Sequence, residues 1–348
     1  MPASATEAAV RAAFARQAEW AARLGSPFMA RLCTLLGERL DRGSEAGRRV
    51  LDWPGDADAL ADALPLRLAG GLHALVRSGG AAALASCFPP NAPPDDELFW
   101  SALRPVLDRP DLPPWLDRAP QTNEVGRSAV LMSGLLVVAD LFPQPMELLE
   151  LGASAGLNLL PDRYGHDLGG VRAGDPASPL RLRPEWKGPP PPDVPVEVAG
   201  RRGVDLNPLD PHRDGDRLLA YVWPDQIGRL ARLEAALAVA AADPPRVDIG
   251  DAAEWTEAQL AGPRAAGVTR VVFHSIAFQY FPERTKARIA AALEQAGAAA
   301  AAGAPLAWLR YEHEAGEARI TLRLRTWPGD EERLLACCHP HGSAIHWL

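Results

Sequence analysis

The segment ELGASAG places one acid and three small residues at alternate positions: Glu150, Gly152, Ser154 and Gly156. It follows the apolar stretch MELLEL and precedes LNLL, which predicts a turn between a strand and a helix. Three explanations remain open. The small residues could let a nucleotide ligand approach the backbone, Ser154 could be the nucleophile of a G-x-S-x-G elbow, or the turn could be close-packed without any ligand.

The first explanation fits a methyltransferase loop better than a dinucleotide fingerprint, which needs a glycine where the chain has Leu157. A carboxylate at the strand end, Glu150, could anchor the ammonium group of S-adenosylmethionine. Asp205 ends the next predicted strand and would accept from the ribose hydroxyls, while Asp251 would meet the adenine amino group. The predicted cofactor-binding residues are Glu150, Gly152, Ala153, Ser154, Gly156, Asn158, Asp205 and Asp251.

The spacing of these acids implies an insertion. Asp205 follows the turn by about 50 residues, against about 20 in the usual dinucleotide-binding unit. The elbow explanation has a different difficulty, because an α/β-hydrolase needs several strands before its nucleophile and an oxyanion segment of HGGG type. The preceding 140 residues carry helical signals instead, although histidines follow late in the chain, at His339, His341 and His346.

Helix and strand signals divide the chain into two expected domains. Residues 1–140 are predicted to form a helical N-terminal cap domain, in which Ser26 caps a helix that starts at Pro27. Residues 141–348 alternate strands with helices, which predicts a Rossmann-like, mostly parallel sheet with helices on both faces. The segments ARITLRLRTW and RLLACCHPHGSAIHW are expected to add an antiparallel pair, completing the strand set of the class I methyltransferase fold. SPLRLRPEW and VPVEVAG could form a hairpin around the proline loop 188–195.

Composition narrows the class of partner. Hydrophobic residues make up 47% of the 348 residues, enough for a sizeable core, and the net charge is −8 without a basic stripe. These features argue against nucleic acid or an anionic membrane surface as the main partner. They favour a small molecule or a protein, and we expect a small-molecule substrate. The four cysteines show no disulfide spacing, and the chain has no signal segment and no run of about 18 apolar residues. We therefore expect a cytoplasmic protein. The sequence does not indicate its oligomeric state.

Six motifs carry a family resemblance: QTNEVGRSA, ELGASAGLNLLPDRY, GVDLNPLDP, WPDQIGRL, VVFHSIAFQY and HPHG. Together they resemble the bacterial proteins grouped as domain of unknown function 2332, over nearly the whole chain. The C-terminal half of that family is similar to S-adenosylmethionine-dependent methyltransferases. The resemblance implies a fold and a cofactor more than it implies a reaction.

His274 follows the apolar residues VVF at the end of a predicted strand, where it would face the transferable methyl group and the substrate. A neutral imidazole there could accept a proton from an oxygen or nitrogen nucleophile. Gln279 and Tyr280 follow closely and could hold the substrate, so these three residues are the predicted catalytic set. The alternative is a histidine that only orders the loop.

Asn123, Glu124 and Arg127 precede the last predicted helix of the N-terminal part. Thr122 or Asn123 could cap that helix, and Glu124 could favour its first turn. Alternatively, the side chains of Asn123 and Glu124 could reach the cleft and, with Arg127, bind substrate. In CCHPHG, the side chains of Cys337, His339 and His341 would share one face if the strand continued. Its spacing is not that of a zinc site, so no metal is expected.

The sequence thus predicts an S-adenosylmethionine-dependent methyltransferase that acts on a small or medium-sized acceptor held between the cap and the Rossmann-like domain. Two alternatives stay open. One is a serine hydrolase that uses Ser154, and the other is a non-catalytic module that binds a cofactor or a partner.

Overall fold

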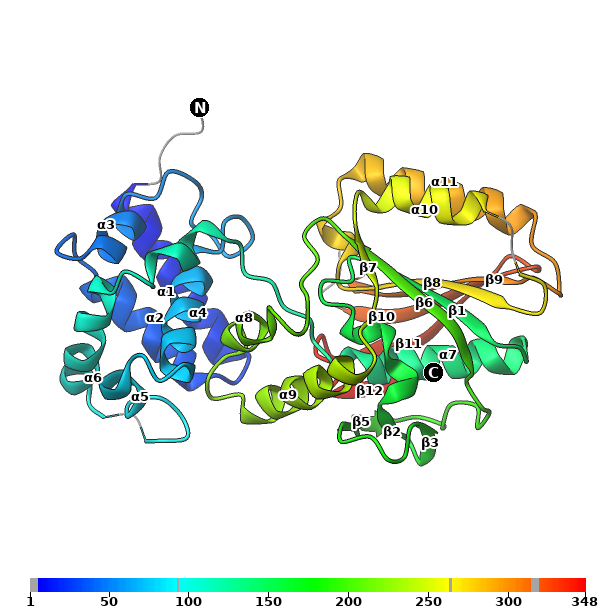
Figure 1. Ribbon diagram of the computed structural model, residues 1–348, viewed down its shortest axis with the longest axis horizontal. Helices are drawn as coiled ribbons and strands as arrows, with labels where there is room; N and C mark the ends of the chain where they lie inside the picture. The colour runs from blue at the N-terminus through cyan, green and yellow to red at the C-terminus, as the bar shows by residue number, and fades with distance from the viewer. Residues whose placement is uncertain (1–5, 93, 263–264, 314–318) are drawn as a thin grey trace. The chain divides into compact units, whose positions relative to one another are not determined.

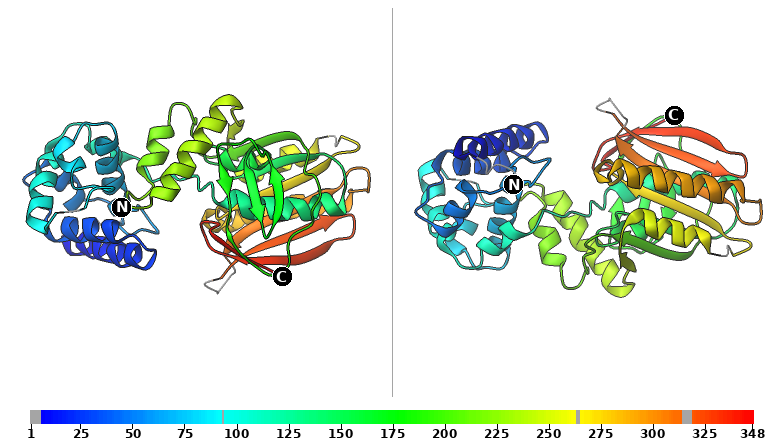
Figure 2. Two further views of the ribbon diagram at one scale, coloured as in Figure 1. Left: turned by 90° about the horizontal axis from the view of Figure 1, so that it is seen from below. Right: turned by 90° about the horizontal axis from the view of Figure 1, so that it is seen from above.

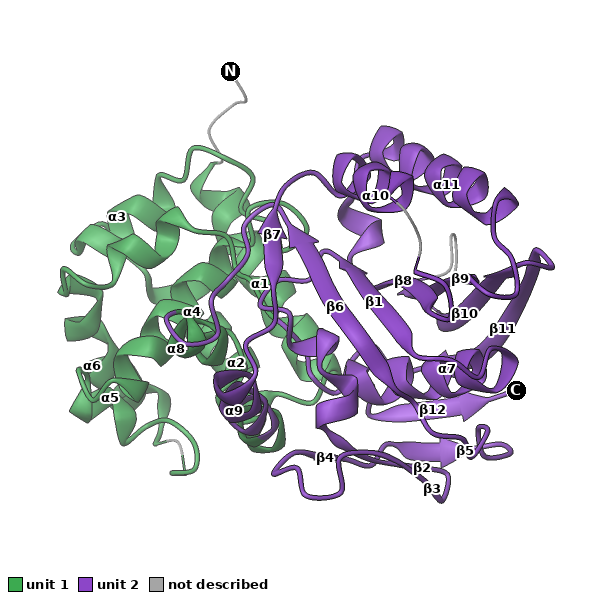
Figure 3. Ribbon diagram, turned by 45° about the vertical axis from the view of Figure 1, so that its right-hand side comes forward, with its two compact units in different colours: residues 1–122, 214–231 green, residues 123–213, 232–348 purple. Residues whose placement is uncertain are grey.

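The computed structural model describes residues 6–92, 94–262, 265–313 and 319–348 (Figure 1). Contacts between residues divide the chain into two units (Figure 3). Unit 1 comprises Met1–Thr122 and Asp214–Ala231, and unit 2 comprises Asn123–Arg213 and Arg232–Leu348. Each unit is therefore built from two separate segments of the chain.

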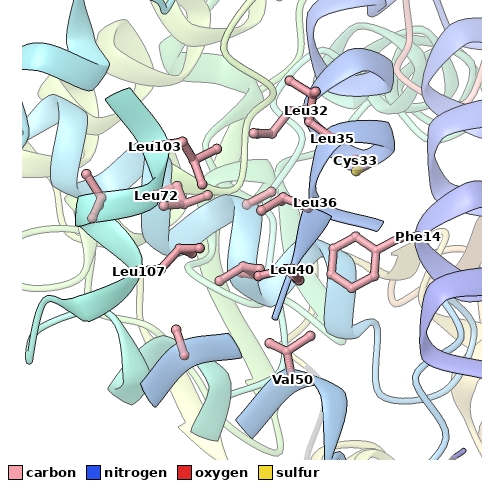
Figure 4. Close-up of a cluster of buried hydrophobic side chains, with 14 of the residues drawn as sticks. Phe14, Leu32, Cys33, Leu35, Leu36, Leu40, Val50, Leu72, Leu103 and Leu107 are labelled. Carbon is pink, nitrogen blue, oxygen red and sulfur yellow. The ribbon is translucent and has the colours of Figure 1, made fainter. Parts of the chain in front are cut away.

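Unit 1 is helical. Its helices and 3-10 turns are α1 (Glu7–Arg23), α2 (Pro27–Arg39), α3 (Glu45–Leu51), α4 (Leu64–Arg77), α5 (Ala82–Ala85), α6 (Asp96–Leu103), η1 (Arg104–Asp108), η2 (Pro113–Asp117), α8 (Gly215–Ala220) and the first residues of α9 (Ile227–Ala242). Apolar side chains from several of these helices pack in one core, among them Phe14, Leu32, Leu36, Leu72 and Leu103 (Figure 4). This burial is the main term that holds the unit together.

One acid joins the two segments of unit 1. Ser26 caps α2 and Pro27 is the first helical residue, as the sequence predicted. The Ser26 hydroxyl donates to the carboxylate of Asp225, which also accepts the Phe28 backbone N–H at 2.9 Å. Asp225 belongs to the WPDQIGRL motif, so this motif fastens residues 214–231 to the start of α2.

Unit 2 contains a nine-stranded sheet in the order β5-β12-β11-β10-β9-β8-β1-β6-β7. The strands are β1 (Met146–Leu151), β5 (Glu185–Lys187), β6 (Val198–Asp205), β7 (Val247–Ile249), β8 (Thr269–Ser275), β9 (Leu306–His313), β10 (Ile320–Trp327), β11 (Glu331–Cys338) and β12 (Ala344–Trp347). Strands β7, β6, β1, β8 and β9 are parallel, and β10, β11 and β12 follow as antiparallel neighbours. The chain is thus an α/β protein with a helical N-terminal region and a mixed, mostly parallel sheet.

Helices cover both faces of the central strands (Figure 2). Helices α10 (Ala252–Ala261) and α11 (Glu283–Ala298) lie on one face, and α7 (Arg127–Leu141) lies on the other. Strand β8 is consequently buried along its whole length. A parallel strand covered on both faces needs a continuous apolar sequence, and VVF supplies it.

The insertion expected between the glycine turn and Asp205 forms a second, three-stranded sheet in the order β3-β2-β4. Its strands are β2 (Gly165–Leu168), β3 (Val171–Gly174) and β4 (Arg181–Leu182). The short turns η3 (Leu157–Leu159) and η4 (Pro161–Arg163) connect it to β1. These two turns replace the helix that LNLL predicted.

The predicted hairpin around the proline loop is wrong. Strand β4 pairs with β2, β5 pairs with β12, and β6 pairs with β1. Local alternation in SPLRLRPEW and VPVEVAG indicated strands but could not indicate their partners. The predicted antiparallel pair at the C-terminal end is confirmed by β10 and β11, and its second segment turns at residues 339–343 to add β12.

Helix α7 lies inside the range 1–140 that we expected to form the helical domain, yet it contacts β9 and β10 of unit 2. Residues 128–139 of this helix are all buried, as in a core helix. With 15 residues it is shorter than the roughly 20 needed to span a bilayer. Within the described ranges, no helix combines the length and the apolar character that a membrane crossing requires.

We predict that Asp225→Ala lowers the free energy of unfolding of unit 1 by about 1–3 kcal/mol, because the Ser26 hydroxyl and the Phe28 N–H lose their shared acceptor. Urea denaturation followed by tryptophan fluorescence measures the change. Asp216→Ala is the matched control, since Asp216 is exposed in the same segment. Equal effects of both substitutions would show that the cap does not join the segments.

Candidate functional site at the strand ends

The carboxyl ends of β7, β6, β1, β8 and β9 meet at one edge of the main sheet. In chain order these parallel strands are the third, second, first, fourth and fifth, so the strand order reverses between β1 and β8. Ligands of open α/β sheets bind outside the carboxyl ends of the strands at such a reversal. The residues after β1 and β8 therefore occupy the expected place for a site.

The turn after β1 has three residues with left-handed backbone: Gly152, Ser154 and Gly156, with φ of 69°, 54° and 73°. This conformation is unfavourable for serine, which has a Cβ atom. The Ser154 N–H donates to the Asp205 carboxylate at 2.9 Å, and Asp205 also accepts from the Asn207 N–H at 2.9 Å. Asp205 thus stabilises the turn from the end of β6.

Close packing accounts for the glycines of this turn. A Cβ atom on Gly152 would lie 2.7 Å from Ala277 Cβ, and one on Gly156 would lie 2.8 Å from Val247 Cγ2. Beneath the turn, a Cβ on Gly203 of β6 would lie 2.6 Å from Ala153 Cβ. The glycine spacing by itself is therefore explained by neighbouring strands and loops.

Packing does not account for Glu150. Its side chain is buried, and its Oε2 atom has no hydrogen-bond partner among the described residues. Burial raises the pKa of this carboxyl well above its usual value, and the nearby charge of Asp205 raises it further, while Arg127 opposes the shift. The Ser154 hydroxyl is also buried without a partner in the described part of the chain. An acceptor and a hydroxyl are thus left unsatisfied at the strand reversal, which is rare in folded proteins.

Asn123 and Glu124 form a buried network with the segment after the turn. The Asn123 side-chain oxygen accepts the Leu157 N–H at 2.9 Å. Asn158 accepts from the Ser128 hydroxyl at 2.9 Å and donates to the Glu124 carbonyl. The motifs QTNEVGRSA and ELGASAGLNLL therefore meet in space, which their separation in the sequence does not reveal.

The capping role considered for Asn123 is wrong, because α7 is preceded by Gly126 and has no side-chain cap. Glu124 instead accepts the Gly126 N–H at 3.0 Å. Arg127 donates to the carbonyls of Ser275 and Pro340, at 2.8 and 3.1 Å. It thereby links the end of β8 to the HPHG turn.

Asp251 caps α10. Its Oδ1 atom accepts the backbone N–H groups of Ala253 and Glu254, at 2.9 and 3.1 Å. Oδ2 makes no hydrogen bond to the described residues. Two apolar side chains stand exposed nearby at the ends of the adjacent strands: Leu206, 68% exposed, and Ile249, 80% exposed.

His274 is fully buried at the end of β8, and both of its ring nitrogens have partners. Nδ1 lies 2.7 Å from Glu312 Oε1, and Nε2 lies 3.2 Å from the indole nitrogen of Trp308. Because an indole N–H can only donate, Nε2 must accept and Nδ1 must carry the proton. The ring also stacks on Phe278, with centroids 4.5 Å apart. This geometry orders the loop after β8.

Glu312 is the residue of this group that sequence analysis missed. Its Oε1 also accepts the N–H groups of Ala277 and Phe278, both at 3.0 Å, while Oε2 is buried without a partner in the described chain. Burial alone would raise the pKa of Glu312, but the hydrogen bond from His274 and the two backbone donors hold the pKa below its usual value. Its position at a strand end, like that of Asp205, was the available signal.

Gln279 and Tyr280 lie beyond this loop anchor, and both are exposed, Tyr280 by 71%. The structure therefore separates the predicted catalytic set into a buried histidine and two solvent-facing side chains. Gln279 and Tyr280 belong to the 3-10 turn η5 (Phe278–Tyr280). This turn begins two residues after Ile276, whose backbone is in the left-handed region.

The CCHPHG segment does not continue as a strand. β11 ends at Cys338, and His339 accepts the His341 N–H in the following turn, so the expected shared face of Cys337, His339 and His341 is wrong. Gly126 packs on this turn, where a Cβ atom would lie 2.3 Å from the His341 carbonyl oxygen. In the described part of the chain, no three His, Cys, Asp or Glu side chains are grouped so that they could hold a metal ion.

Comparison with known proteins identifies a family. A family model described as "Uncharacterized protein conserved in bacteria (DUF2332)" matches residues 11–347. The resemblance seen in the six motifs is thus confirmed for the family, whereas the similarity to methyltransferases stays a prediction. No curated protein matches the chain.

We predict that Gly203→Ala lowers the free energy of unfolding by about 1–3 kcal/mol, since the added methyl would overlap Ala153 in the glycine turn. Gly200→Ala is the control on the same strand. A Cβ there would have its nearest neighbour, Glu147 Cγ, at 3.9 Å, so the expected change is within about 0.5 kcal/mol. Chemical denaturation of both variants measures the difference, and a harmless Gly203→Ala would contradict the close packing.

The raised pKa of Glu150 predicts a stability that depends on pH. Below the unfolded pKa of about 4.3 the carboxyl is protonated in both states. Above it only the unfolded state ionises, so Glu150 lowers the free energy of unfolding by up to about 1.4 kcal/mol per pH unit until the folded pKa is reached. Glu150→Gln should therefore become more stable than the wild type as the pH rises from 5 to 8.

Glu312→Gln provides a control of opposite sign. The lowered pKa of Glu312 means that its ionised form contributes stability above the unfolded pKa, which is lost as the pH falls through the folded pKa. The wild type should thus exceed Glu312→Gln in stability at neutral pH, and the gap should shrink in acid. Thermal melts from about pH 2 to 8 compare the three proteins, because the loss for Glu312 lies below the unfolded pKa of about 4.3. Parallel curves for wild type and Glu150→Gln would contradict the assignment.

Proposed function

Because the chain belongs to the bacterial DUF2332 family, whose description names no activity, we propose its function from the strand-end site: unit 2 binds S-adenosylmethionine and catalyses methyl transfer to a small or medium-sized acceptor. In this proposal the domain is a class I methyltransferase-like one. The strand order around β1 and β8 and the antiparallel strands after β9 support that assignment. The cofactor would lie over the carboxyl ends of β1, β6 and β7.

The buried Glu150 carboxyl carries the proposal. A carboxyl with an unsatisfied oxygen is costly in an apolar surrounding unless a charged or donating group meets it. The ammonium group of S-adenosylmethionine is such a group. Ligands of open α/β sheets bind where the strand order reverses, which here is between β1 and β8, so a bound ligand would bring its ammonium group close to Glu150. The neighbouring Ser154 hydroxyl, which also has no partner in the described chain, could donate to or accept from the same end of the ligand.

The remaining acids suit the other parts of the ligand. Each Asp205 oxygen accepts one backbone N–H and keeps a lone pair for a ribose hydroxyl. Asp251 has Oδ2 available for the adenine amino group. The exposed side chains of Leu206 and Ile249 would be covered by a flat apolar ring, which is a reason for their otherwise unfavourable position at adjacent strand ends.

S-adenosylmethionine supplies an electrophilic methyl group on a sulfonium sulfur when it is bound, so the protein needs mainly to align the acceptor with it. In this geometry His274 is a positioning residue, because both ring nitrogens are engaged and Glu312 holds the loop in place. Gln279 and Tyr280 are the exposed side chains that this loop presents to an acceptor. The turn after β1 is stabilised by hydrogen bonds to Asn123 and to the Glu124 carbonyl. The end of β8 is stabilised by Arg127, which donates to the Ser275 carbonyl.

A serine hydrolase has one observation in its favour, the left-handed backbone of Ser154 in a G-x-S-x-G sequence. A nucleophilic serine needs a base within hydrogen-bond reach. The Ser154 hydroxyl makes no hydrogen bond to any described residue, and His274 is bonded elsewhere. Labelling of Ser154 by a fluorophosphonate would favour the hydrolase over methyl transfer.

We predict that S-adenosylhomocysteine, which keeps the ammonium group, binds the full chain and raises its melting temperature. Glu150→Gln should weaken this binding by about tenfold or more, because the charge-assisted contact is lost. Glu147→Gln is the matched control on β1, where the carboxylate pairs with Arg270 at 2.7 Å. Isothermal titration calorimetry measures all three affinities.

The same titrations contain a second test. Glu150 must lose its proton when it meets the ammonium group, so the affinity of the wild type should rise with pH below the folded pKa of Glu150, and a proton should be released into the buffer. Glu150→Gln should show neither effect. The proposal fails if the wild type does not bind S-adenosylhomocysteine, or if Glu150→Gln binds it as tightly.

A further inference from the structure

Residues of the small sheet β3-β2-β4 and of the segment before β4 line an open surface cavity of about 240 Å³. We propose that this cavity binds a phosphoryl group, either free inorganic phosphate or the phosphate of a small phosphorylated metabolite. It lies in the insertion between β1 and β6, and the strand-end site uses none of its lining residues. The inference is therefore independent of the proposed methyl transfer.

Strand register places three arginines on one face of the small sheet. Asp167 of β2 is directly opposite Arg172 of β3, and Gly165 of β2 pairs with Arg181 of β4. Residues two apart on a strand share a face. Continuing this register brings Arg183 beside Asp167, and their charged groups lie 3.9 Å apart. Arg172, Arg181 and Arg183 therefore line the same cavity, and all three are exposed to solvent.

The positive charge of this face is only partly neutralised, by the ion pair between Asp167 and Arg183. Asp167 is the single acid in the lining, against three arginines. Arg172 and Arg181 form no ion pair with a described carboxylate, and Arg181 donates instead to the Pro176 carbonyl at 2.5 Å. The chain as a whole carries a net charge of −8. A local excess of unpaired arginines in an acidic chain is a feature that an anionic ligand would explain.

Glycines permit the close packing and the tight turn of the small sheet. Gly165 pairs with Gly174 on one side and with Arg181 on the other, so no second side chain stands beside Arg181 at that level. A Cβ on Gly174 would lie 2.0 Å from the Tyr164 carbonyl oxygen, so only glycine fits there. Gly169 and Gly170 join β2 to β3 with φ of 62° and 99°, as in a tight two-residue hairpin. This hairpin fixes Arg172 across from Asp167.

Size and donor type select the ligand. The volume is below the roughly 300–1,000 Å³ of pockets for drug-sized ligands, so the ligand is small. Guanidinium groups present flat pairs of N–H donors that match the oxygens of a phosphoryl group. Three such groups around one cavity favour a dianion over a single carboxylate, because each oxygen finds a donor.

The test measures binding of inorganic phosphate and of glycerol 3-phosphate to the full chain by isothermal titration calorimetry in 0.15 M sodium chloride. Saturable binding is expected, and Arg172→Gln and Arg181→Gln should each weaken it by about tenfold or more. Arg333→Gln is the control, since Arg333 is a partly exposed arginine of β11 outside this cavity. Asp167→Asn should strengthen binding, because the competing negative charge is removed.

The two ligands distinguish the sources of the phosphoryl group. Tighter binding of glycerol 3-phosphate would assign the cavity to a phosphorylated metabolite, and equal or tighter binding of inorganic phosphate would assign it to the free ion. Absence of saturable binding by the wild type would overturn the proposal. So would binding that survives in Arg172→Gln and Arg181→Gln, or an Asp167→Asn variant that binds more weakly than the wild type.

Discussion

The strand-end site depends on the hydrogen bond between the Ser154 N–H and the Asp205 carboxylate. Without it, a serine would have little reason to keep a left-handed backbone at the end of β1. With it, the turn directs the chain so that Leu157 meets Asn123 and Asn158 meets Ser128. One contact across two strand ends therefore positions the residues that join α7 to the sheet.

Two glutamates at the same edge illustrate how surroundings decide charge. Glu150 and Glu312 are both largely buried at strand ends, and each keeps one oxygen without a described partner. Glu312 has three N–H donors on its other oxygen, and its pKa is lowered. Burial raises the pKa of Glu150, and the like charge of Asp205 raises it further. The first is thus suited to hold a loop, and the second to meet a cation.

Several residues of the sequence motifs stabilise the fold and are not available to bind a ligand. Asp225 joins the two segments of unit 1, Arg127 and Gly126 bring the HPHG turn to the end of β8, and Gly203 makes room for Ala153. For each of these residues, the local sequence was also compatible with a role in ligand binding, but the structure shows a packing or hydrogen-bonding role. Two buried polar groups around the end of β1 have no hydrogen-bond partner among the described residues: the Glu150 Oε2 atom and the Ser154 hydroxyl. These two groups indicate where a ligand would bind.

The sequence by itself determined the elements: the helical N-terminal region, the apolar strands β1 and β8, the cap at Ser26, and the acids at the ends of β1 and β6. These features depend on hydrophobic periodicity and on residues that are close in the sequence, so a short segment of the chain is enough to predict them. Tertiary structure alone decided that β5 pairs with β12, that α7 packs on β9 and β10, and that His274 is enclosed by Glu312 and Trp308. These outcomes depend on contacts between residues far apart in the chain, where local pattern carries no information about the partner.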